Sequence, residues 1–226
     1  MDMKKIIACA ALVMGVVIFN GRLNAAVESD IVGYTTITTQ AGYNMMGCVF
    51  KGLGSETVSL NDLLTGDFVA GDQVQLYVAA TGGYTLYTYN ATSGWMTGRV
   101  SADDRPVALG DSFWLYTPGR EVTVTVKGAV SADNFTYTSV QGLQMVASTL
   151  PLPLEINGAT WTGLSNGDQI QVVNTSGGYT IYTYSTATGK WMQGRVPADV
   201  TIPVGSSMWL NTATAGVTLT VSNPLN

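Results

Sequence analysis

The chain has 226 residues, a formal net charge of −5 and 11% charged residues, well below the about 25% of an ordinary soluble chain. This acidic balance argues against nucleic acid as a partner, because nucleic-acid binding depends on neutralising phosphates, and it provides no basic patch for anionic lipid. The sequence contains no His, which removes the commonest general base and the commonest zinc ligand.

Residues 1–26 have the three parts of a signal peptide. Lys4 and Lys5 form a basic start, 6–19 is an apolar run, and small residues lead up to Ala26. The apolar run is shorter than the about 20 residues that a membrane-spanning helix needs. We therefore expect export to the cell surface or the extracellular space, cleavage near Ala25 or Ala26, and no membrane span in the mature chain.

Short strands are predicted throughout the mature chain, because β-branched and aromatic residues alternate with polar ones between Gly-rich turns. Ser59 begins a short segment, 59–64, in which we expect a helix capped by that hydroxyl. Strands at this spacing are typical of a sandwich or a barrel. In the first half the predicted strands lie near 31–39, 43–50, 73–79, 84–89, 95–99, 112–117 and 122–127.

The second half of the chain repeats the first. Similar residues recur at nearly constant offsets, so that 71–76, 84–89 and 95–100 return as 167–172, 179–184 and 191–196. We predict an all-β protein of two tandem homologous domains, each a β-sandwich or barrel-like, at 27–128 and 129–226. Both copies keep turn glycines and strand aromatics, which is typical of a framework rather than of a catalytic set.

Large side chains occupy both faces of the most aromatic predicted strand. Tyr87 and Tyr84 fall on opposite faces, because side chains alternate along a strand. One face can cover a core, and the other needs a neighbouring domain, a partner subunit or a sugar ring. An ordinary core of cross-strand aromatic pairs is the alternative. The candidates for an assembly interface or a glycan-stacking platform are Tyr87, Tyr89, Tyr182 and Tyr184.

Cys48 is the one cysteine of the mature chain, because Cys9 leaves with the signal peptide. An odd cysteine in an exported chain can pair between molecules, which makes Cys48 a candidate intermolecular thiol. Its neighbours are apolar, and a free cysteine is often simply a small buried residue. The second copy has Ser148 at the corresponding place.

No catalytic or metal-binding pattern is present. The sequence lacks a Gly-x-Ser-x-Gly elbow, a phosphate loop and a dinucleotide fingerprint, so we expect no cofactor. Carboxylates are the remaining route to chemistry, yet one enzyme seldom needs the same site twice. We interpret the acids after the Trp-containing strands as loop-tying partners of arginine, in the pairs Arg99 with Asp103 and Arg195 with Asp199.

One family shares this arrangement of motifs. The motifs lie at 71–76, Gly83-Tyr84, 87–89, Gly94-Trp95, Gly110 and 113–115, together with the opening 30–34. In these segments the chain resembles an uncharacterised family of exported duplicated-β proteins of the planctomycete–verrucomicrobial type. The resemblance implies export and a β-rich fold, and it supplies no catalytic residues. The second copy departs from it by lacking a matching Gly-Tyr opening.

These observations favour a non-enzymatic, exported structural protein that self-assembles into a surface or extracellular layer or filament. The low charge, the duplication and the two-sided aromatic strands are its basis, and an exposed edge within 27–39 is the expected place for strand addition. A carbohydrate-binding module using the strand tyrosines is the alternative. A hydrolase using Asp103 or Asp199 is a third and weaker hypothesis.

Overall fold

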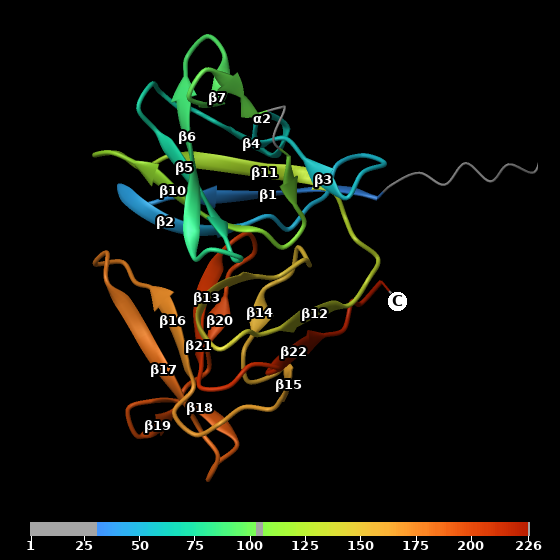
Figure 1. The fold of residues 1–226 in the computed structure, drawn as a ribbon, viewed down its shortest axis with the longest axis vertical. Coiled ribbons are helices and arrows are strands. Elements are labelled where there is room, and N and C mark those ends of the chain that lie inside the picture. Colours follow the sequence, from blue (N-terminus) through green and yellow to red (C-terminus); the bar gives the residue numbers. More distant parts are fainter. Residues whose placement is uncertain (1–30, 103–105, 226) are drawn as a thin grey trace, which may run out of the picture. The chain divides into compact units, whose positions relative to one another are not determined.

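The computed structural model describes residues 31–102 and 106–225. The predicted signal peptide, 1–26, lies outside the described residues. Over the described residues the protein is all-β apart from one short helix, α2 (Leu60–Leu63), and its strands pair in antiparallel sheets (Figure 1). In the first half the strands are β1 (Val32–Thr38), β2 (Gly42–Gly47), β3 (Thr57–Val58), β4 (Leu64–Gly66), β5 (Gln73–Val78), β6 (Gly83–Asn90), β7 (Gly94–Thr97), β8 (Val100–Ser101), β9 (Val107–Ala108), β10 (Ser112–Thr117) and β11 (Thr123–Ala129).

The strands of the second half follow in a similar order of lengths and spacings. They are β12 (Phe135–Thr138), β13 (Gly142–Ala147), β14 (Leu154–Glu155), β15 (Thr160–Thr162), β16 (Gln169–Val173), β17 (Tyr179–Ser185), β18 (Lys190–Gln193), β19 (Val196–Pro197), β20 (Thr201–Ile202), β21 (Ser207–Thr212) and β22 (Thr218–Val221). Every strand predicted for the first half is confirmed, and the short β3, β4, β8 and β9 are additional.

The two halves have the same sheet topology. In the first, β1-β11-β4 form a three-stranded sheet, β2-β10-β5-β6-β7-β8 a six-stranded sheet, and β3 pairs with β9. In the second, β12-β22-β15, β13-β21-β16-β17-β18-β19 and β14-β20 repeat that order. The sequence repeat is therefore a repeat of strand pairing, and corresponding residues can be compared one by one.

Each half has its own hydrophobic core. Trp95 is buried in the first and Trp191 in the second, where burial of such large apolar surfaces contributes most to folding. A third, smaller cluster joins the halves and contains Met45, Trp114 and Met145. Residues 31–226 form one compact unit, so the division into two domains stays a prediction.

Helix α2 confirms the predicted helix and its cap. The Ser59 hydroxyl accepts a hydrogen bond from the backbone N–H of Asp62, which satisfies a donor that the helix leaves unpaired. The helix also positions Asn61, whose Oδ1 accepts the Trp95 backbone N–H at 2.8 Å. In the second half Asn157 accepts the Trp191 N–H at 3.2 Å.

Candidate functional site

The predicted site tyrosines face the cores. Tyr87 is only 2% exposed, and Tyr89 packs edge-on against Trp95 with ring centroids 5.2 Å apart. Tyr182 and Tyr184 pack against the second core. Tyr87 is buried and the other three tyrosines are half-buried, so this face offers a partner or glycan less aromatic surface than the sequence predicts, and its role as an interface stays a prediction. The ordinary aromatic core is the interpretation that the structure supports.

The opposite face of the same strands is the exposed one. Tyr84 and Tyr179 are 42% and 43% exposed, and each lies at the same position of its hairpin. The Trp114 Nε1–H donates to the Tyr84 hydroxyl at 3.3 Å, and Trp209 donates to Tyr179 at 3.4 Å. The sequence predicts large residues on both faces of these strands and places the interface on the face of Tyr87, but Tyr84 and Tyr179 lie on the more exposed face.

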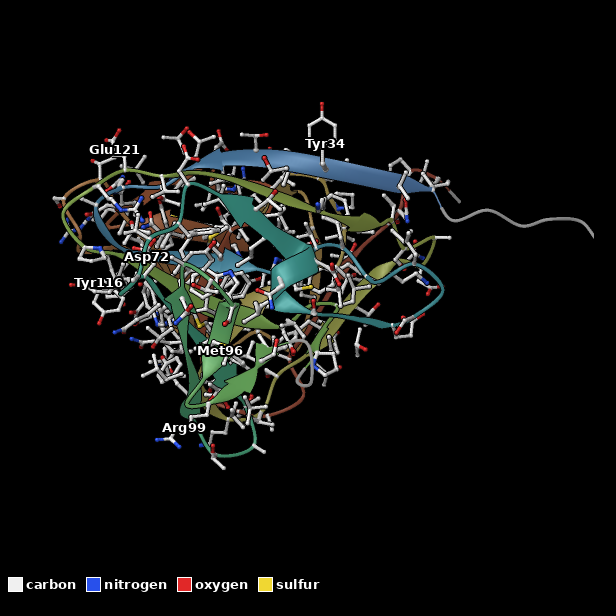
Figure 2. All side chains as sticks on the ribbon, turned by 90° about the horizontal axis from the view of Figure 1, so that it is seen from above. Tyr34, Asp72, Met96, Arg99, Tyr116 and Glu121 are labelled. Carbon is white, nitrogen blue, oxygen red and sulfur yellow. The ribbon has the colours of Figure 1, made fainter. Side chains whose placement is uncertain are left out.

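The predicted pair of Arg195 with Asp199 is not among the ion pairs of the described residues, and the pair of Arg99 with Asp103 stays a prediction. Arg195 and Asp199 are both exposed and unpaired with each other, and Asp103 lies outside the described residues. Arg99 projects away from the fold in Figure 2, whereas Asp72 lies within it. An ion pair between exposed side chains contributes little to stability. The acid that holds a loop in place is instead a buried one.

That acid is Asp72, with Asp168 as its equivalent. The Asp72 carboxylate accepts the Val69 N–H at 2.9 Å and is ion-paired with Arg120, which also donates to the Asp67 carbonyl at 3.0 Å. Both aspartates stand just before a central strand, β5 or β16, and are essentially inaccessible. Neither aspartate is among the loop-tying acids that the sequence predicts, because nothing local in the sequence marks a buried charge.

Cys48 is inaccessible rather than poised to pair between molecules. Its exposure is 0%, and its thiol donates to the Phe50 carbonyl at 3.0 Å. Burial raises the pKa of the Cys48 thiol to about 12, which removes the reactive thiolate at ordinary pH. The prediction that Cys48 is a small buried residue is therefore confirmed, and the prediction that it pairs between molecules is not supported.

A surface open to strand pairing lies along β1, an edge strand of its three-stranded sheet. In an antiparallel ladder alternate residues direct their backbone groups to the same neighbour. The Ile31 carbonyl accepts from Val130 and the Thr39 N–H donates to Val122, so the odd-numbered residues face β11. The even-numbered residues, from Val32 to Thr38, consequently direct their N–H and C=O groups to the free edge. No partner for them lies among residues 31–102 and 106–225.

This edge also lacks the features that normally block pairing. The strand is seven residues long and contains neither a charge nor a Pro, which are the usual protections of an exposed edge. Ile31, Val32 and Tyr34 are 60%, 65% and 75% exposed. Tyr34 projects outward from β1 in Figure 2. A groove of about 930 Å³, lined in part by Val32, Tyr34, Leu53 and Lys127, adjoins the strand.

The other edge strands are shorter or lie in the contact between the halves. β4, β8, β15 and β19 have two or three residues each. At β2 the Gly47 N–H donates to the Gly205 carbonyl at 2.9 Å, and Ala147 of β13 lies against Gly47. The exception is β12, the counterpart of β1. The Ser139 N–H donates to Val217, so Thr136 and Thr138 direct their backbone groups to the free edge.

The described residues contain no cluster of three or more His, Cys, Asp or Glu side chains arranged to hold a metal ion. Over the same residues no helix combines the length and apolar character needed to cross a bilayer. Comparison of the chain with protein-family models, with curated proteins and with solved structures found no match. The function is therefore inferred from the geometry of this chain alone.

Proposed function

We propose that the chain is an exported, non-enzymatic structural protein that self-assembles by strand addition into a surface or extracellular layer or filament. The observation that carries the proposal is the long, uncharged and unpaired edge of β1. Two tandem β-sandwich or barrel-like domains after a cleaved signal peptide complete this proposal.

The repeat supports a second copy of this chain as the occupant of the edge. β1 and β12 occupy equivalent positions, and in both strands the even-numbered residues direct their backbone groups outward. One chain thus carries two free edges of the same design. Pairing β1 of one copy with β12 of the next is a heterologous contact, and such contacts generate open filaments where the rotation does not close. Pairing β1 with β1 would instead close a dimer.

Backbone pairing would supply the affinity, and side chains would supply the register. The outward faces of the two edge strands are rich in threonine, including Thr36, Thr38, Thr136 and Thr138. Threonine has high β-propensity and adds no charge to repel a neighbouring strand. The low charge of the whole chain removes a further obstacle to close packing of copies.

Proline substitution tests the edges without breaking the fold. Thr36→Pro and Thr136→Pro each remove an N–H that points to the free edge, where Pro is tolerated. Assembly of the purified mature chain would be followed by light scattering and electron microscopy. Ala91→Pro, in the exposed turn after β6, is the matched control because no backbone hydrogen bond there uses the Ala91 N–H.

We expect Ala91→Pro to assemble like the unchanged chain and each edge variant to stop growth. A mixture of the two edge variants should form dimers and no longer species, because each still has one intact edge. Loss of assembly in Thr36→Pro alone would indicate β1–β1 dimers instead of filaments. An unchanged chain that stays monomeric at high concentration would overturn the proposal.

A further inference from the structure

A second surface is a small aromatic pocket to which both halves of the chain contribute. Its volume is about 290 Å³, near the lower end of the about 300–1,000 Å³ typical of small-molecule sites. The first half provides side chains from β2, β5, β6 and β10, and the second half provides the β16–β17 hairpin. The lining consists of Tyr43, Gln75, Tyr84, Trp114, Val173, Gly177 and Tyr179.

The pocket is neutral and rich in aromatic rings. None of the lining side chains carries a charge, so the pocket holds no cationic group that would pair with an anion. Tyr43 is 51% exposed and rests on Tyr116, with ring centroids 4.5 Å apart, and it meets Trp114 edge-on at 5.9 Å. These contacts hold the Tyr43 ring in place while part of it stays open to a ligand.

The hydrogen-bonding groups of the pocket are also fixed in direction. The Tyr84 hydroxyl accepts from the Trp114 Nε1–H, and the Tyr179 hydroxyl accepts from Trp209. An indole N–H can only donate, so each tyrosine is confined to the acceptor role toward its tryptophan and retains its own O–H proton for another acceptor. The Gln75 side-chain amide adds both a donor and an acceptor.

We propose that this pocket binds the ring of a neutral pyranose sugar. One face of such a ring presents C–H groups, which pack well on an aromatic face carrying partial negative charge. The hydroxyls at its rim can accept from Tyr84 and Tyr179 and bond to Gln75. A ring of this size suits the small volume, and the absence of a cationic side chain in the lining selects against the carboxylate of uronic acids.

The pocket is distinct from the strand face of Tyr87 and Tyr182 and from the edges proposed for assembly. It uses the outward face of β6 and β17, whereas Tyr87 and Tyr182 occupy the covered face. None of its lining residues belongs to β1 or β12. Sugar binding and strand addition are therefore separable, and Thr36→Pro should bind the sugar as the unchanged chain does.

Saturation-transfer NMR and calorimetry test the proposal with defined probes. These are the methyl glycosides of glucose, galactose and mannose, N-acetylglucosamine, and glucuronic acid as the charged comparison. We expect at least one neutral glycoside to bind with millimolar affinity, about what a single small ring achieves, and glucuronic acid to bind more weakly. Loss of one donated hydrogen bond in Tyr84→Phe or Tyr179→Phe should weaken binding about fivefold.

Matched controls come from the same strands. Leu86 and Ile181 lie on the same exposed face as Tyr84 and Tyr179 but outside the lining, so their Ala variants should bind like the unchanged chain. Tyr43→Ala removes the stacking ring and should weaken binding more than either Phe variant. Circular dichroism verifies that each variant is folded. The proposal is overturned if no neutral glycoside binds, or if both Phe variants and Tyr43→Ala bind as tightly as the unchanged chain.

Discussion

The guanidinium of Arg120 is ion-paired with the carboxylate of Asp72, which is 0% exposed. At the equivalent turn of the second half, Asp168 instead accepts the Ala213 backbone N–H at 2.9 Å. The residue that corresponds to Ala213 is Pro118, which has no N–H to donate. Arg120 contacts the Asp72 oxygen that also accepts the Val69 N–H, whereas the other oxygen of Asp72, equivalent to the one that Ala213 satisfies in Asp168, lacks a hydrogen-bond partner.

Removing the guanidinium should strongly destabilise the first half. Arg120→Ala leaves the Asp72 charge buried without its partner, a change that typically costs about 3–5 kcal/mol. We expect the lower end of that range, because the Arg120 side chain is 28% exposed. The free energy of unfolding from urea titration measures the effect. Arg99→Ala is the control, since Arg99 is exposed on a surface loop.

A second substitution should recover part of that loss. Pro118→Ala in the Arg120→Ala background recreates the Ala213 and Ala215 arrangement of the second half and returns a backbone N–H near Asp72. A recovered hydrogen bond to a charged group is worth about 1.5–3 kcal/mol. If the double variant is no more stable than Arg120→Ala alone, the equivalence of the two turns is wrong.

Cys48 should make the protein sensitive to alkaline pH. Burial raises the pKa of its thiol from 9.0 to about 12, and the Asp111 carboxylate acts in the same direction. Below pH 9 the thiol is protonated in both the folded and the unfolded chain, so its contribution to stability is fully present there. Between pH 9 and about 12 only the unfolded chain loses the proton, and stability falls by up to about 1.4 kcal/mol per pH unit.

Cys48→Ser isolates this contribution, because Ser148 occupies the equivalent position of the second half. Burial also raises the pKa of Tyr137 to about 12, so some alkaline loss will remain in the variant. We expect the slope of unfolding free energy against pH to be shallower in Cys48→Ser between pH 9 and 11. Identical slopes, or rapid reaction of the native thiol with a disulfide reagent, would contradict the burial of Cys48.

Asn61 should stabilise the β6–β7 hairpin of the first half. Its Oδ1 accepts the Trp95 N–H, and Asn61→Ala would leave that donor without its partner. We expect a loss of about 1–3 kcal/mol in unfolding free energy. Asn157→Ala removes the longer bond from the Trp191 N–H together with the bond that Asn157 donates to the Ala198 carbonyl, so it should cost a similar amount. Equal and negligible effects would show that water replaces both asparagines.

The strands could be predicted because the alternation of apolar and polar residues that defines them lies within a short stretch of sequence. Val124 and Val126 alternate with exposed or half-buried residues along β11, and this period of two survives in the structure. The turn at Gly82 could be predicted in the same way, because a turn that needs a positive φ favours Gly, and the φ of Gly82 is 66°. The helix cap at Ser59 followed from the same kind of local pattern.

The sequence could not predict which face of a strand is buried or which residues form the buried ion pair, because both depend on residues far apart in the chain. Tyr87 and Tyr84 are equivalent as sequence, and only the packing of Trp95 and Phe113 in the core decides which is buried. The role of Arg120 depends on a contact with Asp72 that spans several intervening strands. The alternation of residues therefore predicts that each strand has two faces, and tertiary packing decides which of the two is buried.

Gly47 should control the contact between the halves. A Cβ at this position would lie 2.3 Å from the Ala147 Cβ, closer than two carbons can approach, so Gly47→Ala must push β2 away from β13. Overpacking of this kind costs about 1–3 kcal/mol. Gly178→Ala is the control, because its added Cβ meets only the Asn174 side chain at 3.7 Å. Chemical denaturation measures each variant.

The compensating change tests whether the two residues act on each other. Ala147→Gly removes the methyl group that the new Gly47→Ala side chain would meet, so the double variant should be more stable than the sum of the single effects predicts. A coupling energy of about 1 kcal/mol would be within the range for residues in contact. Strictly additive effects would mean that the halves do not meet at this point in solution, and the pocket formed by both halves would then lose its structural basis.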